Sequence, residues 1–90
     1  MEVLYGKPVR KRVEKRKLPR QIWADFRDAF LSLAVTMNFR LFDIKKLTVK
    51  GPLAYYRLRI GKCRALFHFD QTAIYVEDIA PRPEVYRTWR

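Results

Sequence analysis

The chain has 90 residues, of which 49% are hydrophobic and 14% aromatic, and it carries a formal net charge of +11. This length fits one domain, and the apolar content can fill a core, which argues against a disordered chain. The uninterrupted apolar stretches are only a few residues long, whereas a membrane span needs ~18–20. We therefore expect a single domain over residues 1–90, without a membrane-spanning segment.

The residue types also limit the chemistry. Cys63 is the only cysteine, so an internal disulfide is excluded, which fits a reducing cytoplasm. Residues 1–17 lack the apolar region of a secretory signal, and we expect a cytoplasmic protein. One histidine and one cysteine are too few for a Cys/His zinc site. Ser32, the only serine, lies in a helix-like stretch, which argues against a Ser-His-Asp nucleophile.

Positive charge is concentrated in two stretches of the sequence. Lys7–Arg20 and Arg40–Arg64 each contain eight basic residues and one acidic residue, for +7 each, which leaves −3 for the rest of the chain. Such clustering favours a polyanionic partner, nucleic acid before a membrane surface. A neutralising acidic protein would satisfy the same charge. A solvated helix face explains the first stretch equally well.

The first half of the chain predicts a strand and two helices. Met1–Tyr5 fits a short strand, and Pro8 suits the first turn of a basic helix. A second helix starts at Leu18-Pro19, because apolar residues then recur with a period of 3.6. This apolar stripe consists of Leu18, Ile22, Trp23, Phe26, Ala29, Phe30 and Leu33. From Asn38 to Pro52 we expect a basic loop with a short strand near Leu41–Ile44.

The second half predicts a three-stranded meander. Tyr55–Ile60 alternates with a period of two, and Gly61-Lys62 fits a type II′ turn with glycine in the first central position. Cys63–Phe69 is the returning strand, Asp70-Gln71 a weaker turn, and Thr72–Ala80 the third strand. Pro83 begins a short final helix through Trp89. The predicted fold is α+β: a small antiparallel sheet with a helical hairpin packed on one side and a short C-terminal helix.

This register brings three arginines to one face of the hairpin. Arg59 faces Arg64 across the first turn, and a two-residue turn at Asp70-Gln71 places Phe67 opposite Ile74 and Arg64 opposite Glu77. Like charges directly opposite each other destabilise a sheet, so Arg59 beside Arg64 needs an anion to offset it. Glu77 offers one carboxylate for the three guanidiniums of Arg57, Arg59 and Arg64, and a phosphate is the natural remaining counter-charge. A merely solvated arginine face accounts for the pattern about equally well.

The C-terminal half resembles the RelE/ParE toxin superfamily, in particular RelE-type members. The resemblance lies in Tyr56-Arg57-Leu58-Arg59-Ile60-Gly61-Lys62-Cys63-Arg64-Ala65-Leu66-Phe67, then Ile74-Tyr75-Val76, then Arg82-Pro83-Glu84-Val85-Tyr86. The helical hairpin matches this family in pattern only.

The resemblance implies the toxin of a type II toxin–antitoxin system that cuts mRNA in the ribosomal A site. It implies a metal-independent endoribonuclease without a cofactor, in which the RNA 2′-hydroxyl is the nucleophile and an acidic antitoxin is the neutralising partner. Carried over by position, the catalytic residues are Arg57, Arg59, Arg64, Arg82 and Tyr86. Arg64 and Arg82 would hold the phosphate oxygens, and Tyr86 would serve as the acid or position the leaving group.

This sequence departs from the family where RelE-type enzymes often have two lysines. Arg57 and Arg59 stand there, and arginine does not lose its proton in proteins, so we assign both to phosphate binding. The general base is left open among Lys62, Tyr86 and a water molecule. The lone His68 is interpreted as a surface residue. The lysines that would widen the RNA-binding surface are Lys45, Lys46, Lys50 and Lys62.

Two other functions fit the sequence. A ParE-type inhibitor of DNA gyrase has the same fold and does not need Arg82 and Tyr86 in catalytic geometry. A non-catalytic nucleic-acid-binding domain explains the charge and leaves Tyr86 without a role. We rank the ribosome-dependent endoribonuclease first.

Overall fold

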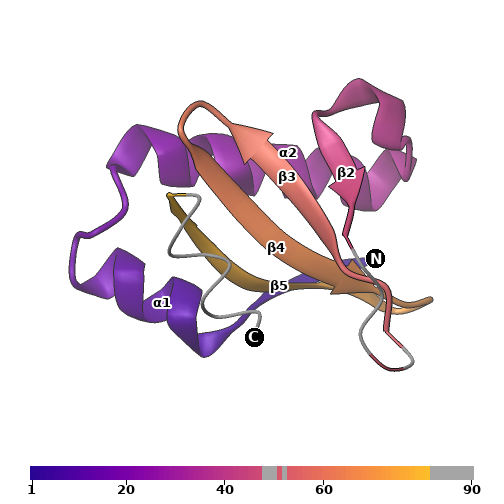
Figure 1. Ribbon diagram of the computed structural model, residues 1–90, viewed down its shortest axis with the longest axis horizontal. Helices are drawn as coiled ribbons and strands as arrows, with labels where there is room; N and C mark the ends of the chain where they lie inside the picture. Colours follow the sequence, from indigo (N-terminus) through magenta and orange to yellow (C-terminus); the bar gives the residue numbers. More distant parts are fainter. Residues whose placement is uncertain (48–50, 52, 82–90) are drawn as a thin grey trace.

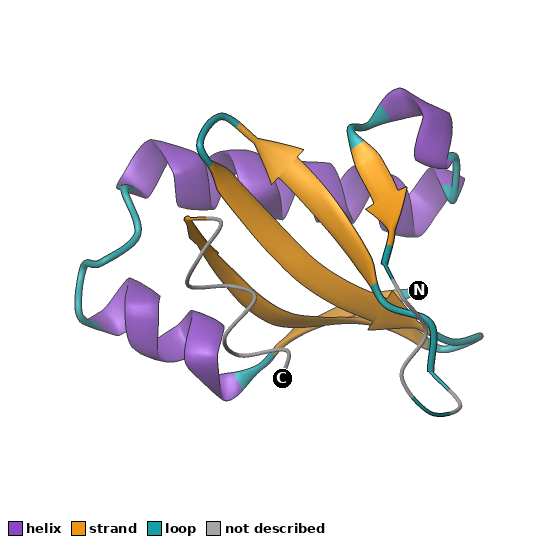
Figure 2. Ribbon diagram, in the orientation of Figure 1, coloured by secondary structure: helices purple, strands orange, loops and turns teal. Residues whose placement is uncertain are grey.

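The computed structural model describes residues 1–47, 51 and 53–81. These residues form two α-helices and a short 3₁₀ helix beside one sheet, arranged as in Figures 1 and 2. The elements in chain order are β1 (Glu2–Tyr5), α1 (Lys7–Glu14), α2 (Arg20–Thr36), η1 (Phe39–Leu41), β2 (Ile44–Lys46), β3 (Tyr56–Ile60), β4 (Cys63–Phe69) and β5 (Ala73–Pro81). The predicted α+β class is confirmed. The predicted final helix, Pro83 through Trp89, lies outside the described residues.

The five strands form one sheet in the order β1-β5-β4-β3-β2. All neighbours are antiparallel except β1, which pairs with β5 in parallel. The sheet is therefore mixed, where the sequence predicted an antiparallel one. A period-two pattern identifies strands but not their direction, and β1 meets its partner only after more than sixty intervening residues. The backbone of Gly6 lies so close to β5 that a Cβ at this position would be 3.3 Å from two β5 carbonyl oxygens. The helix α1 therefore begins directly beside β5.

The predicted helical hairpin is present and covers one face of the sheet. Figure 1 shows α2 running behind β3 and β4, with α1 beside the end of β5. The hairpin bends between the helices at Arg16, which has a φ of +57°. The apolar stripe of α2 faces the sheet, and Phe30 meets Phe67 edge to face with ring centroids 5.3 Å apart. The residues without solvent exposure in this core are Val9, Phe26, Phe30, Leu33, Ala65, Phe67, Ile74 and Ile79.

The predicted β3–β4 hairpin is confirmed residue for residue. Ile60 pairs with Cys63, Arg59 with Arg64, and Tyr56 with Phe67. Gly61 has a φ of +59°, whereas Lys62 is not among the residues with positive φ. A positive φ at the first central position alone is the feature of the predicted type II′ turn.

The predicted β4–β5 register is wrong. Phe69, not Phe67, pairs with Ile74, and Arg64 pairs with Ala80 rather than Glu77. The turn closes one residue later than predicted because the Asp70 carboxylate accepts hydrogen bonds from the backbone N–H groups of Thr72 and Ala73, at 2.8 and 3.0 Å. Aspartate at the first turn position is a known signal for such a turn.

A bulge between Leu66 and Phe67 shifts the register again. It sets Glu77 aside as the extra residue of β5, and Asp78 pairs with Leu66 while Ile79 pairs with Ala65. The parity of β5 therefore reverses, so that Ile79 enters the core and Asp78 turns to the opposite face.

The segment before β2 also differs from the prediction. The chain forms η1 over Phe39–Leu41, where the Asn38 side chain accepts a hydrogen bond from the Arg40 backbone N–H at 3.2 Å. The short strand comes later, at Ile44–Lys46, where it pairs with β3. In the described ranges no helix is both long and apolar enough to cross a membrane.

Candidate nucleic-acid interface

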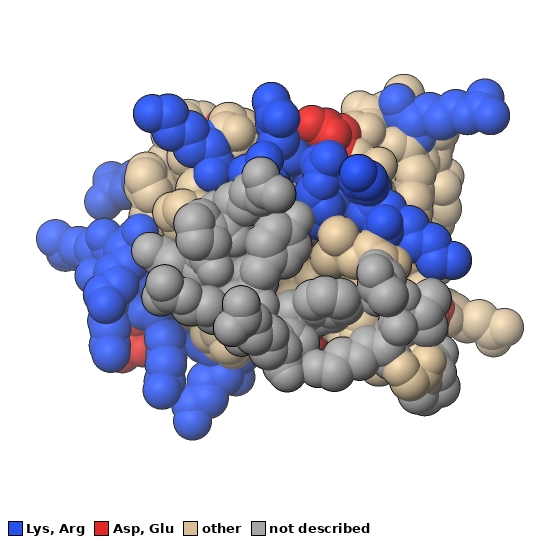
Figure 3. Space-filling view, in the orientation of Figure 1, with Lys and Arg blue, Asp and Glu red and all other residues tan. Residues whose placement is uncertain are grey.

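The face of the sheet away from α2 carries the predicted arginines in two rows. One row crosses three strands from Lys45 through Arg57 to Leu66, and the next joins Arg59 to Arg64. Both rows point away from Leu58 and Ala65, which lie on the core face. Figure 3 shows that Lys and Arg side chains gather over α1 and along the β2–β3 side of the sheet. The tertiary structure thus brings Arg57, Arg59 and Arg64 together as the sequence predicted.

Asp43, just before β2, neutralises part of this face. The Arg57 Nη1 donates to Asp43 Oδ1 at 3.0 Å, and the Arg59 Nε lies 3.5 Å from Asp43 Oδ2. Arg57 has 17% of its side chain exposed and Arg59 51%, so Arg57 is the more firmly held of the two. Sequence analysis missed this residue, although it is the single acid within the second basic stretch.

Arg64 is different because no described carboxylate pairs with it. The sequence placed Glu77 opposite Arg64, but the bulge removes Glu77 from that position and Ala80 takes its place. Glu77 instead lies with its Oε1 2.8 Å from the His68 Nε2. Arg64 therefore faces another cation, Arg59, on β3 and an apolar residue on β5. Within the described residues, Arg64 therefore has a like charge beside it and no carboxylate partner.

The predicted lysines divide between the two faces and the turn. Lys45 pairs with Arg57 and shares its face, whereas Lys46 pairs with Tyr56 and lies on the face of the core residues. Lys62 is exposed in the β3–β4 turn, beside the row formed by Arg59 and Arg64. The structure thus places two of these lysines close to the arginines.

Three residues of the predicted site lie outside the described residues: Lys50, Arg82 and Tyr86. Their proposed roles in binding and catalysis stay predictions. The last described residue of β5, Pro81, pairs with Cys63 next to the Arg64 row.

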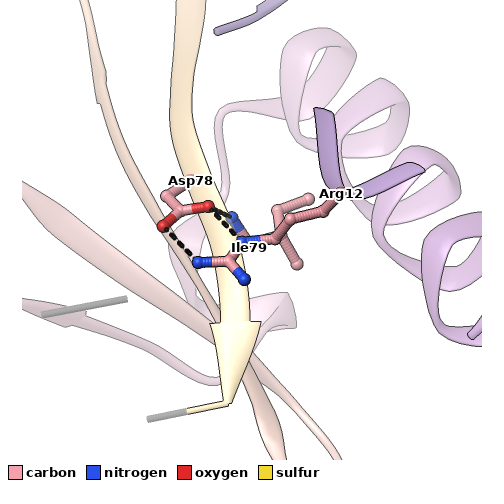
Figure 4. Close-up of polar contacts among 3 residues, drawn as sticks. All are labelled: Arg12, Asp78 and Ile79. Carbon is pink, nitrogen blue, oxygen red and sulfur yellow. Dashed lines mark hydrogen bonds and ion pairs between the residues drawn. The ribbon is translucent and has the colours of Figure 1, made fainter. Parts of the chain in front are cut away.

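A buried ion pair on this face was not predicted from the sequence. Asp78 has no solvent exposure, and its Oδ1 accepts a hydrogen bond from the Arg12 Nε at 3.0 Å and one from its own neighbour, the Ile79 N–H, at 2.9 Å (Figure 4). The Arg12 Nη2 donates to Asp78 Oδ2 at 3.3 Å. This bidentate ion pair joins α1 to β5. The only sequence signal is that two adjacent acidic residues, Glu77 and Asp78, interrupt a mainly apolar strand.

Aromatic side chains occupy the other end of the same face. His68 stacks on Tyr75 with ring centroids 5.0 Å apart, and Tyr55 meets the His68 ring edge to face at 5.3 Å. The Tyr75 hydroxyl donates to Asp70 Oδ2 at 3.2 Å. Hydrogen bonds from Thr72 and Ala73 lower the pKa of Asp70 to about 2. His68 lies on the face predicted from the sequence, but its ring is partly buried among these partners, with 15% exposure.

Comparison with known proteins identifies the fold. No family model matches this sequence, and no curated protein sequence matches it significantly. The chain is similar to a solved archaeal RelE–RelB complex from Pyrococcus horikoshii OT3, with a TM-score of 0.72 and 26% identity over 90% of this chain and 93% of that one. It is also similar to a RelB–RelE antitoxin–toxin complex from Methanococcus jannaschii, with a TM-score of 0.70 and 22% identity over 97% and 99%. The arrangement of the two helices against the five-stranded sheet is therefore the RelE-type toxin fold.

Proposed function

We propose that this chain is the toxin of a type II toxin–antitoxin system, a cytoplasmic endoribonuclease that cuts mRNA in the ribosomal A site. The RelE-type fold supports the toxin assignment. The observation that supports an RNA substrate is the pairing of Arg59 with Arg64 on the face of the sheet away from α2, with no described carboxylate at Arg64. A phosphodiester is the anion that such a pair fits.

The reaction that we propose is an internal transfer without a metal ion. The RNA 2′-oxygen attacks the adjacent phosphorus as its proton leaves to a base, and the bond from phosphorus to the 5′-oxygen breaks. The products are a 2′,3′-cyclic phosphate and a 5′-hydroxyl. Arg64 and Arg59 bind the non-bridging oxygens as their negative charge grows, and removal of one such donor typically costs ~10²–10³ in rate.

Arg57 has a positioning role in this proposal. Its contact with Asp43 fixes the guanidinium beside the Arg59 row, from which it binds a neighbouring phosphate of the RNA. Arginine cannot accept the 2′-hydroxyl proton, so the base is Lys62, Tyr86 or water. Arg82 keeps its expected role in phosphate binding, and Tyr86 its expected role as the acid or as the residue that positions the 5′-oxygen leaving group.

The test is cleavage of a short mRNA bound in purified ribosomes, with the 5′ ends of the fragments mapped. Wild type is compared with Arg64→Ala, Arg82→Ala and Tyr86→Phe, and Arg40→Ala serves as the matched control, because this exposed arginine lies in η1 away from the sheet face. Cuts confined to the A-site codon, lost in the three variants and kept in the control, are expected.

The other outcomes discriminate the alternatives. Tight, salt-sensitive ribosome binding without cleavage would identify a non-catalytic nucleic-acid-binding domain. The absence of both binding and cleavage would favour a gyrase inhibitor of the ParE type.

A further inference from the structure

A bulge in β5 directs Glu77 to the arginine face, the side of the sheet that carries Arg57, Arg59 and Arg64. Glu77 is the extra residue at the register shift opposite Leu66 and Phe67. Its carboxylate contacts His68, which lies on the same face, and its side chain keeps 42% exposure. Bulges redirect single side chains and are frequent beside functional sites. Glu77 is therefore placed where RNA bound to the arginine face can reach it.

His68 holds the Glu77 carboxylate through one of its two oxygens. The His68 Nε2 lies 2.8 Å from Glu77 Oε1, and because an ionised carboxylate only accepts hydrogen bonds, this nitrogen is the donor. The imidazole is itself held in place, since it stacks on the Tyr75 ring at 5.0 Å and meets the Tyr55 ring edge to face at 5.3 Å. Among the described residues, no group donates to Glu77 Oε2. The carboxylate is thus an oriented acceptor with one oxygen open to a ligand.

Glu77 differs in this respect from the other acids that border the face. In Asp43, Asp70 and Asp78 both carboxylate oxygens have a partner within the fold. An exposed carboxylate repels the phosphates of RNA, so RNA that crosses this face is not expected to place a phosphate at Glu77. The part of a nucleotide that suits a fixed acceptor is an N–H donor on the edge of a base.

Guanine is the base whose edge fits such an acceptor best. Its Watson–Crick edge carries N1–H and the N2 amino group side by side, and both can donate to one carboxylate, because each carboxylate oxygen has more than one lone pair. In adenine and cytosine the amino group lies next to a ring nitrogen that is an acceptor, and in uracil N3–H lies between carbonyl oxygens. Those lone pairs repel a carboxylate. Single-stranded RNA exposes the Watson–Crick edges of its bases for contacts of this kind.

We propose that Glu77 is a specificity-determining residue that binds the Watson–Crick edge of an unpaired guanine in the RNA, with His68 as its positioning residue. This inference rests on the proposed function, from which the RNA substrate is taken. Glu77 lies three residues from Ala80, which pairs with Arg64, and this separation is roughly 10 Å along a strand. The guanine therefore belongs to a nucleotide near the one whose phosphate Arg64 binds, and Glu77 takes no part in the cleavage step.

The test measures the affinity of the full chain for short oligouridines that carry one central guanine, adenine or inosine. Inosine keeps N1–H and lacks the N2 amino group. The guanine oligomer is expected to bind about 10-fold to 100-fold more tightly than the adenine oligomer, with inosine between them. In Glu77→Gln an amide N–H donor replaces one acceptor oxygen, and the ratio of the two affinities is expected to fall to about threefold or less. The same base substitutions in the A-site codon of ribosome-bound mRNA are expected to change the cleavage rate in the same order.

Two further variants separate base recognition from charge and from folding. Glu14→Gln makes the same change in net charge at an exposed residue of α1, and the preference for guanine is expected to be unchanged. His68→Phe keeps an aromatic ring beside Tyr75 and removes the donor to Glu77, so the preference is expected to fall as in Glu77→Gln. Because the readout is a ratio of affinities, a variant that is only less stable loses affinity for both oligomers and leaves the ratio as it is.

The two measurements judge the inference and the proposed function separately. Cleavage that shows no preference for guanine, or a preference that survives Glu77→Gln, overturns the inference and leaves the endoribonuclease intact. A guanine preference in binding that Glu77→Gln abolishes, without cleavage of any mRNA, supports the guanine site and refutes the endoribonuclease. If His68→Phe keeps the full preference, His68 does not position Glu77. The absence of both binding and cleavage overturns both proposals.

Discussion

Arg12 of α1 and Asp78 of β5 form an ion pair although they lie 66 residues apart in the chain, with Nε 3.0 Å from Oδ1. Asp78 has no exposure, whereas the Arg12 side chain keeps 22%. The pair fixes α1 against the part of β5 that runs beside Arg64.

Removal of one partner from this pair is expected to destabilise the fold strongly. The single variants Arg12→Met and Asp78→Leu each remove one partner, and breaking a buried pair in this way typically costs ~3–5 kcal/mol. The double variant Arg12→Met/Asp78→Leu is expected to cost much less than the sum of the single changes, because no unpaired charge stays buried. Urea unfolding of the four proteins measures both values; additive losses would contradict the coupling.

The facing pair Arg59 and Arg64 predicts a conflict between stability and function. Arg59→Thr removes like-charge repulsion across the hairpin and is expected to raise the free energy of unfolding by ~0.2–1 kcal/mol. The same variant should bind single-stranded RNA more weakly. Arg40→Thr is the control, since Arg40 is an exposed arginine of η1 outside the paired strands, and no stabilisation is expected there. Thermal unfolding and an RNA titration on the same samples test this; equal stability changes at both sites would refute it.

Asp43 competes with RNA phosphate for Arg57 and Arg59. Asp43→Ala is therefore expected to increase the affinity for single-stranded RNA. The slope of log K against log salt concentration should steepen by ~0.7 for each additional phosphate contact. Asp28→Ala, which removes an exposed acid of α2, controls for the change in net charge. A slope that changes equally in both variants would mean that only total charge matters.

The turn at Asp70 predicts how the β4–β5 hairpin responds to acid. Its pKa is lowered from 3.8 to about 2 by hydrogen bonds from Thr72 and Ala73. This stabilisation is present above the unfolded value of 3.8 and is lost as the pH falls toward about 2, because the unfolded chain binds the proton first.

The comparison with Asp70→Asn tests this pH dependence. The difference in the free energy of unfolding between the two proteins should be largest above pH 4 and should shrink as the pH approaches 2. Denaturant unfolding at several pH values gives the profile. A difference independent of pH would show that the carboxylate charge has no part in the turn.

The β3–β4 hairpin could be predicted from the sequence because each of its determinants is local. The alternation of Tyr56–Ile60 fixes which residues face the core, and Gly61 fixes the turn, since a positive φ costs glycine little. One register then follows, and with it the pairing of Arg59 with Arg64. The same local reasoning placed Arg57, Arg59 and Arg64 on one face.

The register of the β4–β5 hairpin could not be predicted from local sequence features. Two turn positions compete at Asp70 and Gln71, and the choice depends on side-chain hydrogen bonds to Thr72 and Ala73 that spacing does not reveal. The bulge at Glu77 then exchanges the faces of the last β5 residues. Neither the position of the turn nor the bulge changes the alternation of apolar residues enough to be predicted from the sequence.

The sequence by itself determined the helical hairpin, the three-stranded meander and the clustered positive charge, because helix and strand periods and turn chemistry act over a few residues. Only the tertiary structure decided the parallel addition of β1, the burial of Asp78 against Arg12 and the contact of Asp43 with Arg57. These contacts join segments that are distant in the chain. Their energy depends on which groups are desolvated together when the whole chain folds.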